Sequence, residues 1–171
     1  MFNENGFINK PEHKFKKNFT KVKEEKRIMN ALEKAFLSMG RQLVGKGRLE
    51  ENDHDYEIFD GGERVIVQLT NVFELGRVRD RKNHEVLESE EMYDDKLMEC
   101  IKRKIGKNYV SLKKSKLWLV AYLDFKHKIS SDISFSKTLG YINSLKENQN
   151  PFNEIWFFDL KSRPISVWKK D

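Results

Sequence analysis

The chain has 171 residues, 35% of them charged and 38% apolar, which is enough for one domain with a buried core. Lys and Arg exceed Asp and Glu by 33 to 27, and this balance favours a polyanionic partner. No apolar run approaches the ~20 residues of a membrane span, and the first residues lack the apolar segment of a signal peptide. The single cysteine, Cys100, excludes an intramolecular disulfide and a cysteine-based zinc site, so we expect a protein of the reducing cytoplasm.

Residues 1–19 show neither a helical nor a strand period, and we expect an irregular basic arm ahead of the folded domain. Phenylalanines and lysines are interleaved in this arm. The phenylalanines can pack into the fold, or the arm can stack bases on Phe and bind phosphates with Lys. The poor order that is usual at termini favours the first interpretation. From Thr20 to Met39 apolar residues recur every three or four positions, which predicts an amphipathic helix that ends at Gly40.

The segment from Asp55 to Val72 is typical of a β-hairpin. Gly61 and Gly62 separate two strand-forming runs, and paired glycines suit a two-residue turn because they tolerate positive φ. The turn also fixes which residues lie opposite each other on the two strands.

With this turn, Asp55 lies opposite Gln68 and Glu57 lies opposite Ile66. Two carboxylates and an amide therefore share one face of the hairpin. The other face is almost wholly apolar and should meet the core; it carries Tyr56, Ile58, Val65, Val67 and Leu69.

The pattern of Asp55, Glu57 and Gln68 resembles the active site of the PD-(D/E)xK nuclease superfamily, which has the restriction-endonuclease-like fold. In that superfamily an Asp begins the second strand of a hairpin, and an acid-x-Lys triplet lies on the third strand. Asp55 matches the first acid, and Gln68 matches the last position in the variant where Gln replaces Lys. Ile66 stands where the triplet has its acid, so the motif is incomplete. Glu57, opposite Ile66, can provide the missing carboxylate from the neighbouring strand.

The resemblance implies that Asp55 and Glu57 hold Mg²⁺ or Mn²⁺ and that Gln68 positions the attacking water. A divalent ion bound by carboxylates neutralises the phosphate and activates water, as phosphodiester hydrolysis requires. Many members also point an acid of the first helix at the metal. Glu33 is that candidate here, although an exposed helical Glu is the simpler interpretation. Gln68 is neutral and cannot replace the charge of a Lys, so we expect a slow enzyme or a lost activity.

The charge of the chain changes sign near residue 95. Residues 84–95 hold six acids and no Lys or Arg, whereas residues 96–116 hold eight Lys or Arg and one Glu. Apolar residues every four positions predict a helix over residues 94–104, with the acid-to-base order that the helix dipole favours. The basic residues either form a solvated helix face or a strip that binds nucleic-acid phosphates. That strip comprises Lys102, Arg103, Lys104, Lys107, Lys113 and Lys114, with Lys116 extending it.

The remaining segments alternate strand and helix patterns, which predicts one α/β domain over residues 20–171 with a mixed central sheet flanked by helices. The order also fits the restriction-endonuclease-like core of a helix, three strands, a helix and a strand. The expected elements are strands over residues 41–50, 117–125, 154–160 and 165–168 and a helix over residues 134–148, N-capped by Ser134 or Ser136.

Three functions fit these observations, in order of preference. The first is a metal-dependent nuclease. The second is a nucleic-acid-binding module that kept the nuclease fold without catalysis, which Ile66 favours. The third is a protein-interaction factor whose basic surface meets an acidic partner. The sequence contains no glycine-rich phosphate loop and no serine nucleophile motif that would indicate another chemistry.

Overall fold

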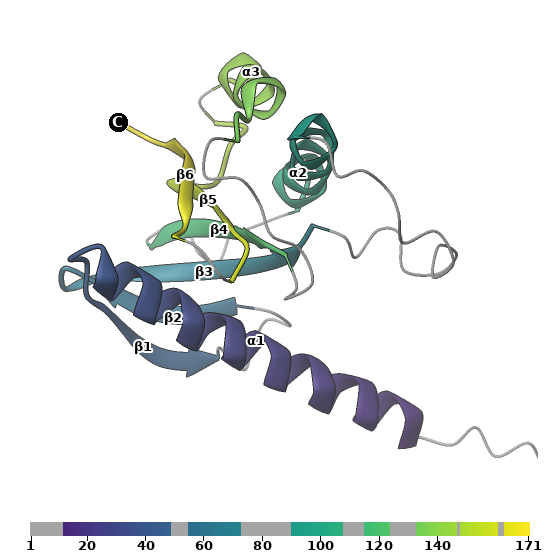
Figure 1. Cartoon of the computed structure of the whole chain (residues 1–171), viewed down its shortest axis with the longest axis vertical. Coiled ribbons are helices and arrows are strands. Elements are labelled where there is room, and N and C mark those ends of the chain that lie inside the picture. Colours follow the sequence, from purple (N-terminus) through teal and green to yellow (C-terminus); the bar gives the residue numbers. More distant parts are fainter. Residues whose placement is uncertain are drawn as a thin grey trace, which may run out of the picture.

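A six-stranded mixed β-sheet with helices on both faces forms the centre of the protein (Figure 1). The computed structural model describes residues 12–48, 55–72, 90–107, 115–123, 133–146, 148–160 and 163–171, with the backbone alone at residues 12–21, 46, 48, 55, 90 and 91. The predicted α/β domain with a mixed central sheet is confirmed. The elements in chain order are α1 (Glu12–Ser38), β1 (Leu43–Arg48), β2 (Asp55–Asp60), β3 (Glu63–Asn71), α2 (Glu90–Ile105), β4 (Lys116–Tyr122), α3 (Ser136–Ser144), β5 (Glu154–Phe158) and β6 (Ile165–Lys169).

The strands lie side by side in the order in which they occur in the chain. β1, β2 and β3 are antiparallel neighbours, β3, β4 and β5 are parallel, and β6 is antiparallel to β5. Parallel neighbours need a crossover connection, and α2 and α3 lie in the two crossovers. Residues 117–122 of β4 are all buried, as the apolar run predicts for a central strand.

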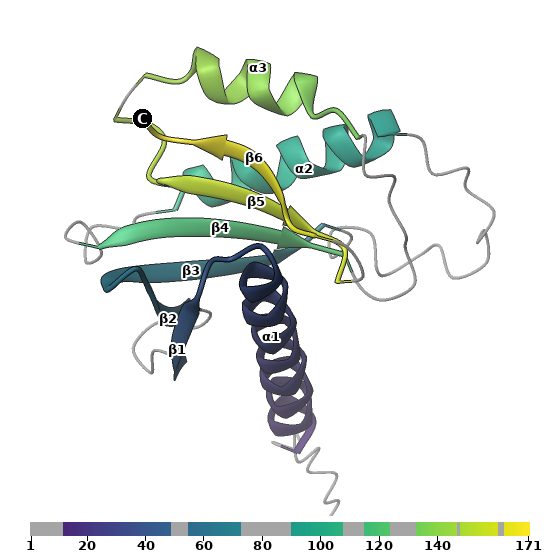
Figure 2. The same ribbon diagram turned by 60° about the vertical axis from the view of Figure 1, so that its left-hand side comes forward.

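The sheet separates two apolar cores. Figure 2 shows the helices on its two faces, α1 on one and α2 and α3 on the other. On one face α1 buries Ile28, Leu32 and Phe36 completely, and burial of such a side chain stabilises the fold by roughly 1.5–3 kcal/mol. They pack against the apolar hairpin face of the sequence analysis, which is thereby confirmed as a core face. On the other face α2 and α3 cover Ile66 of β3 and the side chains of β4 and β5 that point towards these helices.

α1 is longer than the sequence pattern indicates. It begins at Glu12, so the irregular arm expected over residues 1–19 is wrong from that residue on; residues 1–11 lie outside the described part. The segment before Thr20 is rich in Lys, which has a high helix propensity, and this favours continuation of the helix towards Glu12. Among the described helices, none combines the length and the apolar content needed to cross a bilayer.

α3 begins without a capping side chain of its own. Its N-cap residue is Phe135, not Ser134 or Ser136 as the sequence predicts, and the helix ends at Ser144. The carboxylate of Asp94 on α2 instead accepts hydrogen bonds from the backbone N–H groups of Lys137 and Thr138, at 2.8 and 2.9 Å. These hydrogen bonds therefore link α2 to the N-terminus of α3.

Candidate functional site

The hairpin between β2 and β3 has the predicted turn and register. Gly61 and Gly62 have φ angles of 57° and 87°, which fits a tight turn with positive φ at both central positions. The Cα atom of Asp55 is paired with that of Gln68, and Glu57 is paired with Ile66. Asp55 is described through its backbone alone.

Glu57 is held by an arginine of the neighbouring strand. Arg64 Nε donates to Glu57 Oε1 at 2.8 Å, and Arg64 Nη1 donates to Ser115 Oγ at 3.1 Å. The Glu57 side chain is 17% exposed and the Arg64 side chain is 48% exposed. Ile66, where the resembled motif has an acid, is completely buried in the core under α2. Of the two carboxylates expected on this face of the hairpin, the structure describes only that of Glu57. The guanidinium group of Arg64 compensates its negative charge.

Gln68 lies against a buried lysine that the sequence analysis assigned to a surface strip. Lys104 Nζ on α2 donates to Gln68 Oε1 and to the carbonyl oxygen of Leu69, both at 3.3 Å. Lys104 and Gln68 are only 5% and 4% exposed. The ammonium group of Lys104 is therefore held between the Gln68 amide and the backbone of β3. No spacing in the sequence pairs residues 68 and 104, so this contact was missed.

The other basic residues of α2 diverge from one another. Arg103 Nη2 donates to Thr70 Oγ1 on β3 at 3.1 Å, and Lys102 Nζ lies 4.9 Å from the ring centre of Tyr141 on α3. Lys107 is exposed after the end of the helix. Lys113 and Lys114 lie outside the described residues. Of the expected phosphate strip, Lys102, Arg103 and Lys107 are therefore exposed, whereas Lys104 is buried. Lys116, which extends the strip, is exposed and forms an ion pair with Glu63 on β3.

Glu33 is on the opposite side of the sheet from Gln68. It belongs to α1, and its carboxylate lies so close to β1 that a Cβ atom on Gly45 would collide with Glu33 Oε1. Burial raises the pKa of Glu33 above its ordinary value. The structure therefore brings Gln68 and Lys104 together with the Asp55 backbone position but keeps Glu33 apart from them.

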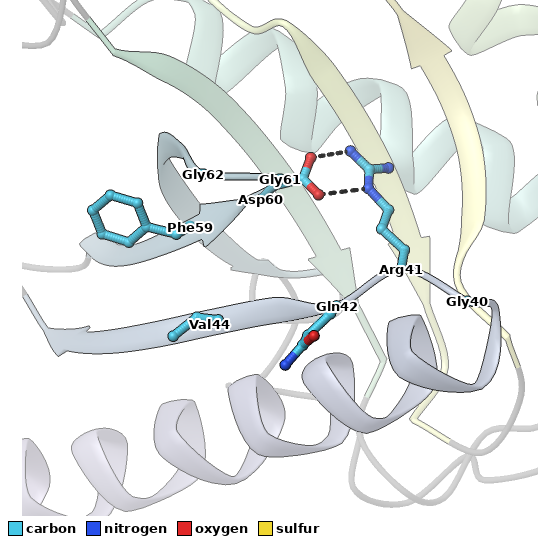
Figure 3. Close-up of a pocket in the computed structure, with 8 residues that line it drawn as sticks. All are labelled: Gly40, Arg41, Gln42, Val44, Phe59, Asp60, Gly61 and Gly62. Atoms are coloured by element: carbon cyan, nitrogen blue, oxygen red, sulfur yellow. Dashed lines mark hydrogen bonds and ion pairs between the residues drawn. The ribbon is translucent and has the colours of Figure 1, made fainter.

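A hollow of about 680 Å³ lies where α1 ends beside the hairpin turn (Figure 3). Arg41 lines it and binds Asp60 through two hydrogen bonds, of 3.0 and 2.5 Å. The same guanidinium reaches Glu154 at 3.2 Å and stacks on Trp118, 4.6 Å from the ring centre. Because Arg41 already binds two carboxylates and an aromatic ring, we assign this hollow a structural role.

Cys100 is completely buried, which confirms the expected core position. Its thiol Sγ lies 3.8 Å from the carbonyl oxygen of Asn71, and burial raises its pKa, so the unreactive thiol form is favoured. Within the described part of the chain, no three His, Cys, Asp or Glu side chains gather as a metal site.

Comparison with protein-family models, with curated proteins and with solved structures gave no match to this chain.

Proposed function

We propose that this protein acts on nucleic acid as a metal-dependent nuclease of the PD-(D/E)xK type. The observation that carries the proposal is the buried contact of Lys104 with Gln68, beside the backbone pair of Gln68 with Asp55. The element order of α1, three strands, α2 and β4 also matches the order that the resemblance implies.

The hairpin residues fit a divalent ion once one ion pair opens. Mg²⁺ is commonly bound by one or two carboxylates together with water and substrate phosphate. Asp55 and Glu57 would hold it, two residues apart on β2. Glu57 is bound to Arg64, whose side chain is 48% exposed, and ion pairs at the protein surface stabilise a fold by roughly 0–1 kcal/mol. A divalent ion can therefore displace Arg64. When bound, it would neutralise the phosphate and lower the pKa of a water molecule.

Lys104 takes over the charge that Gln68 lacks. A neutral amide can orient a water molecule but cannot stabilise the negative charge that develops on a phosphate. The Lys104 ammonium, 3.3 Å from Gln68 Oε1, brings a positive charge to this position from α2. A buried charge is screened little by solvent and salt, so the ammonium would stabilise the negative charge that develops on a phosphate bound beside Gln68.

A binding module without cleavage is the second candidate. The ion pair of Glu57 with Arg64 and the buried apolar Ile66 favour it, because both reduce the number of carboxylates that are ready to hold a metal. In this case Arg103, Lys102 and Lys107 would contact phosphates and the hairpin would serve as scaffold.

Nuclease assays separate the two candidates. Labelled single- and double-stranded DNA and RNA are incubated with the protein and Mg²⁺ or Mn²⁺, and the cleavage rates of wild type, Asp55→Ala and Lys104→Met are compared. We expect cleavage that needs the metal and falls by at least about 100-fold in both variants, the usual size of losing one electrostatic or acid–base group.

Glu63→Gln is the matched control, since it removes an acid at the other end of the same hairpin. It should cleave at the wild-type rate. Binding without cleavage by the wild type would select the second candidate, and neither binding nor cleavage would refute both.

A further inference from the structure

We propose that the outward face of α1 is a second nucleic-acid-binding surface, one that holds the phosphate backbone of a duplex without reading its sequence. The inference rests on the proposed function for the identity of the polyanion, but not on catalysis. The outward face consists of Lys23, Lys26, Arg27, Asn30 and Lys34, and all five residues are exposed.

These five residues lie along one side of the helix. Their spacing of three and four positions places them in neighbouring turns, one above the other. Ile28, Leu32 and Phe36 occupy the opposite side and are completely buried against the sheet. The outward face is therefore the part of α1 that is turned fully away from the core.

The acids of the same stretch of α1 do not belong to this face. Glu25 is 3% exposed, and the Glu33 carboxylate lies against Gly45 of β1. Glu24 is half-buried at the side of the helix. A shallow groove of about 440 Å³ is lined by Ala31 and the five outward residues, so four of its six lining residues are cationic and none is acidic.

The length of the face fits a phosphate backbone. At 1.5 Å per residue, Lys23 and Lys34 are about 16 Å apart along the helix axis. A duplex presents a phosphate on each strand every ~3.4 Å of its axis, so about five phosphates of one strand span this length. The groove contains no aromatic residue on which an unpaired base could stack, which favours a duplex over a single strand.

The outward face of α1 and the hairpin site are on opposite sides of the sheet. Figure 2 shows α1 on one face of the sheet and α2, which carries Lys104, on the other. A nucleic acid bound at Gln68 would therefore have to bend around the sheet to contact the outward face of α1 at the same time. The two surfaces can be tested separately.

The test measures the salt dependence of binding to a fluorescently labelled 20-base-pair DNA duplex in EDTA, which prevents metal-dependent cleavage. Four phosphate contacts give a slope of log affinity against log salt of about −3.6, or about 150-fold weaker binding from about 50 to about 200 mM salt. We expect the wild type to show at least this slope. The double variant Lys26→Gln/Lys34→Gln should lower its magnitude by about two, with an unchanged melting temperature.

Lys137→Gln/Lys146→Gln is the matched control, because it removes the same formal charge near α3. It should leave the slope unchanged. The inference is overturned if both double variants lower the slope equally, or if the protein binds phosphatidylserine vesicles and not the duplex. The inference is also overturned if Lys26→Gln/Lys34→Gln keeps the wild-type slope. If the wild-type protein still cleaves nucleic acid in that case, the nuclease proposal is unaffected. Binding as described without any cleavage would uphold the inference and refute the nuclease proposal alone.

Discussion

Lys104 is a charged residue in a place where most proteins bury apolar side chains. Its ammonium group is hydrogen-bonded to Gln68 and to the Leu69 carbonyl, so the desolvation of three polar groups is compensated by contacts among them. An apolar pair of similar volume would fill the same space at lower cost. The proposed nuclease function would give this buried contact a role beyond packing.

Replacing Lys104 with Met should destabilise the fold by about 1–3 kcal/mol, because Gln68 Oε1 and the Leu69 carbonyl lose their shared donor. Urea denaturation measures this change. The variant Gln68→Met should show a coupling with Lys104→Met of about 0.5–3 kcal/mol, as expected for residues in contact. Strictly additive effects would mean that the hydrogen bond contributes nothing.

Glu33 should make stability depend on pH. Burial raises its pKa in the folded protein above the ordinary value of 4.5. The folded state then binds more protons than the unfolded state between the two pKa values, so stability falls as pH rises through that window. Glu33→Gln removes the charged form, and the variant should be more stable than wild type at pH 7 and equally stable below pH 4.5. Urea midpoints at the two pH values test this, and a variant that is less stable at pH 7 would contradict it.

At the scale of elements, α3 depends on α2 for its N-terminal cap. Asp94 satisfies two backbone N–H groups that the helix itself leaves without acceptors. Because the acceptor is a carboxylate, and one bond is buried and the other partly buried, these bonds are stronger than neutral hydrogen bonds on the surface. The acid-rich segment at the start of α2 therefore caps α3, in addition to interacting favourably with the dipole of α2.

Asp94→Ala should lower stability by about 1–2 kcal/mol and should speed hydrogen exchange of the first amides of α3. Asp95→Ala is the control, since Asp95 forms an exposed ion pair with Lys137 at 3.0 Å. That pair should contribute less than about 1 kcal/mol. Equal effects of the two substitutions would show that the cap is unimportant.

The elements that the sequence predicts correctly are those with local causes. The register of the hairpin follows from Gly61 and Gly62, whose positive φ angles specify the turn. The contact of Lys104 with Gln68 could not be predicted in this way, because the rotation of α2 over the sheet is set by packing between distant residues. The cap of α3 was missed for the same reason, since its acceptor belongs to another helix. The function of the site stays a prediction. The register of the hairpin determines which residues lie opposite each other, but it does not determine which reaction they carry out.

At the scale of the whole molecule, Arg41 joins segments from both ends of the chain. It follows α1, and it binds Asp60 at the end of β2 and Glu154 at the start of β5. The hydrogen bond to Asp60 raises the pKa of Arg41 further, so the guanidinium stays charged at every pH at which the protein folds. The cation lies over Trp118, which adds a cation–π contact.

Arg41→Ala should therefore destabilise the protein by about 3–5 kcal/mol, because Glu154 is 5% exposed and would lose its principal cation. Lys169→Ala is the matched control. Lys169 Nζ is 3.7 Å from Glu154 Oε1 and its side chain is 66% exposed, so its loss should change stability by less than about 1 kcal/mol. Thermal melting compares the two, and a similar small shift for both would contradict the central position of Arg41.

A crystal structure of the protein grown with Mn²⁺ tests the metal site most directly. We expect an anomalous peak within about 2.2 Å of the Asp55 carboxylate, with Glu57 turned from Arg64 towards the ion. The Asp55→Ala protein should lack the peak. A wild-type map without manganese at the hairpin, and with Glu57 still bound to Arg64, would contradict the nuclease assignment.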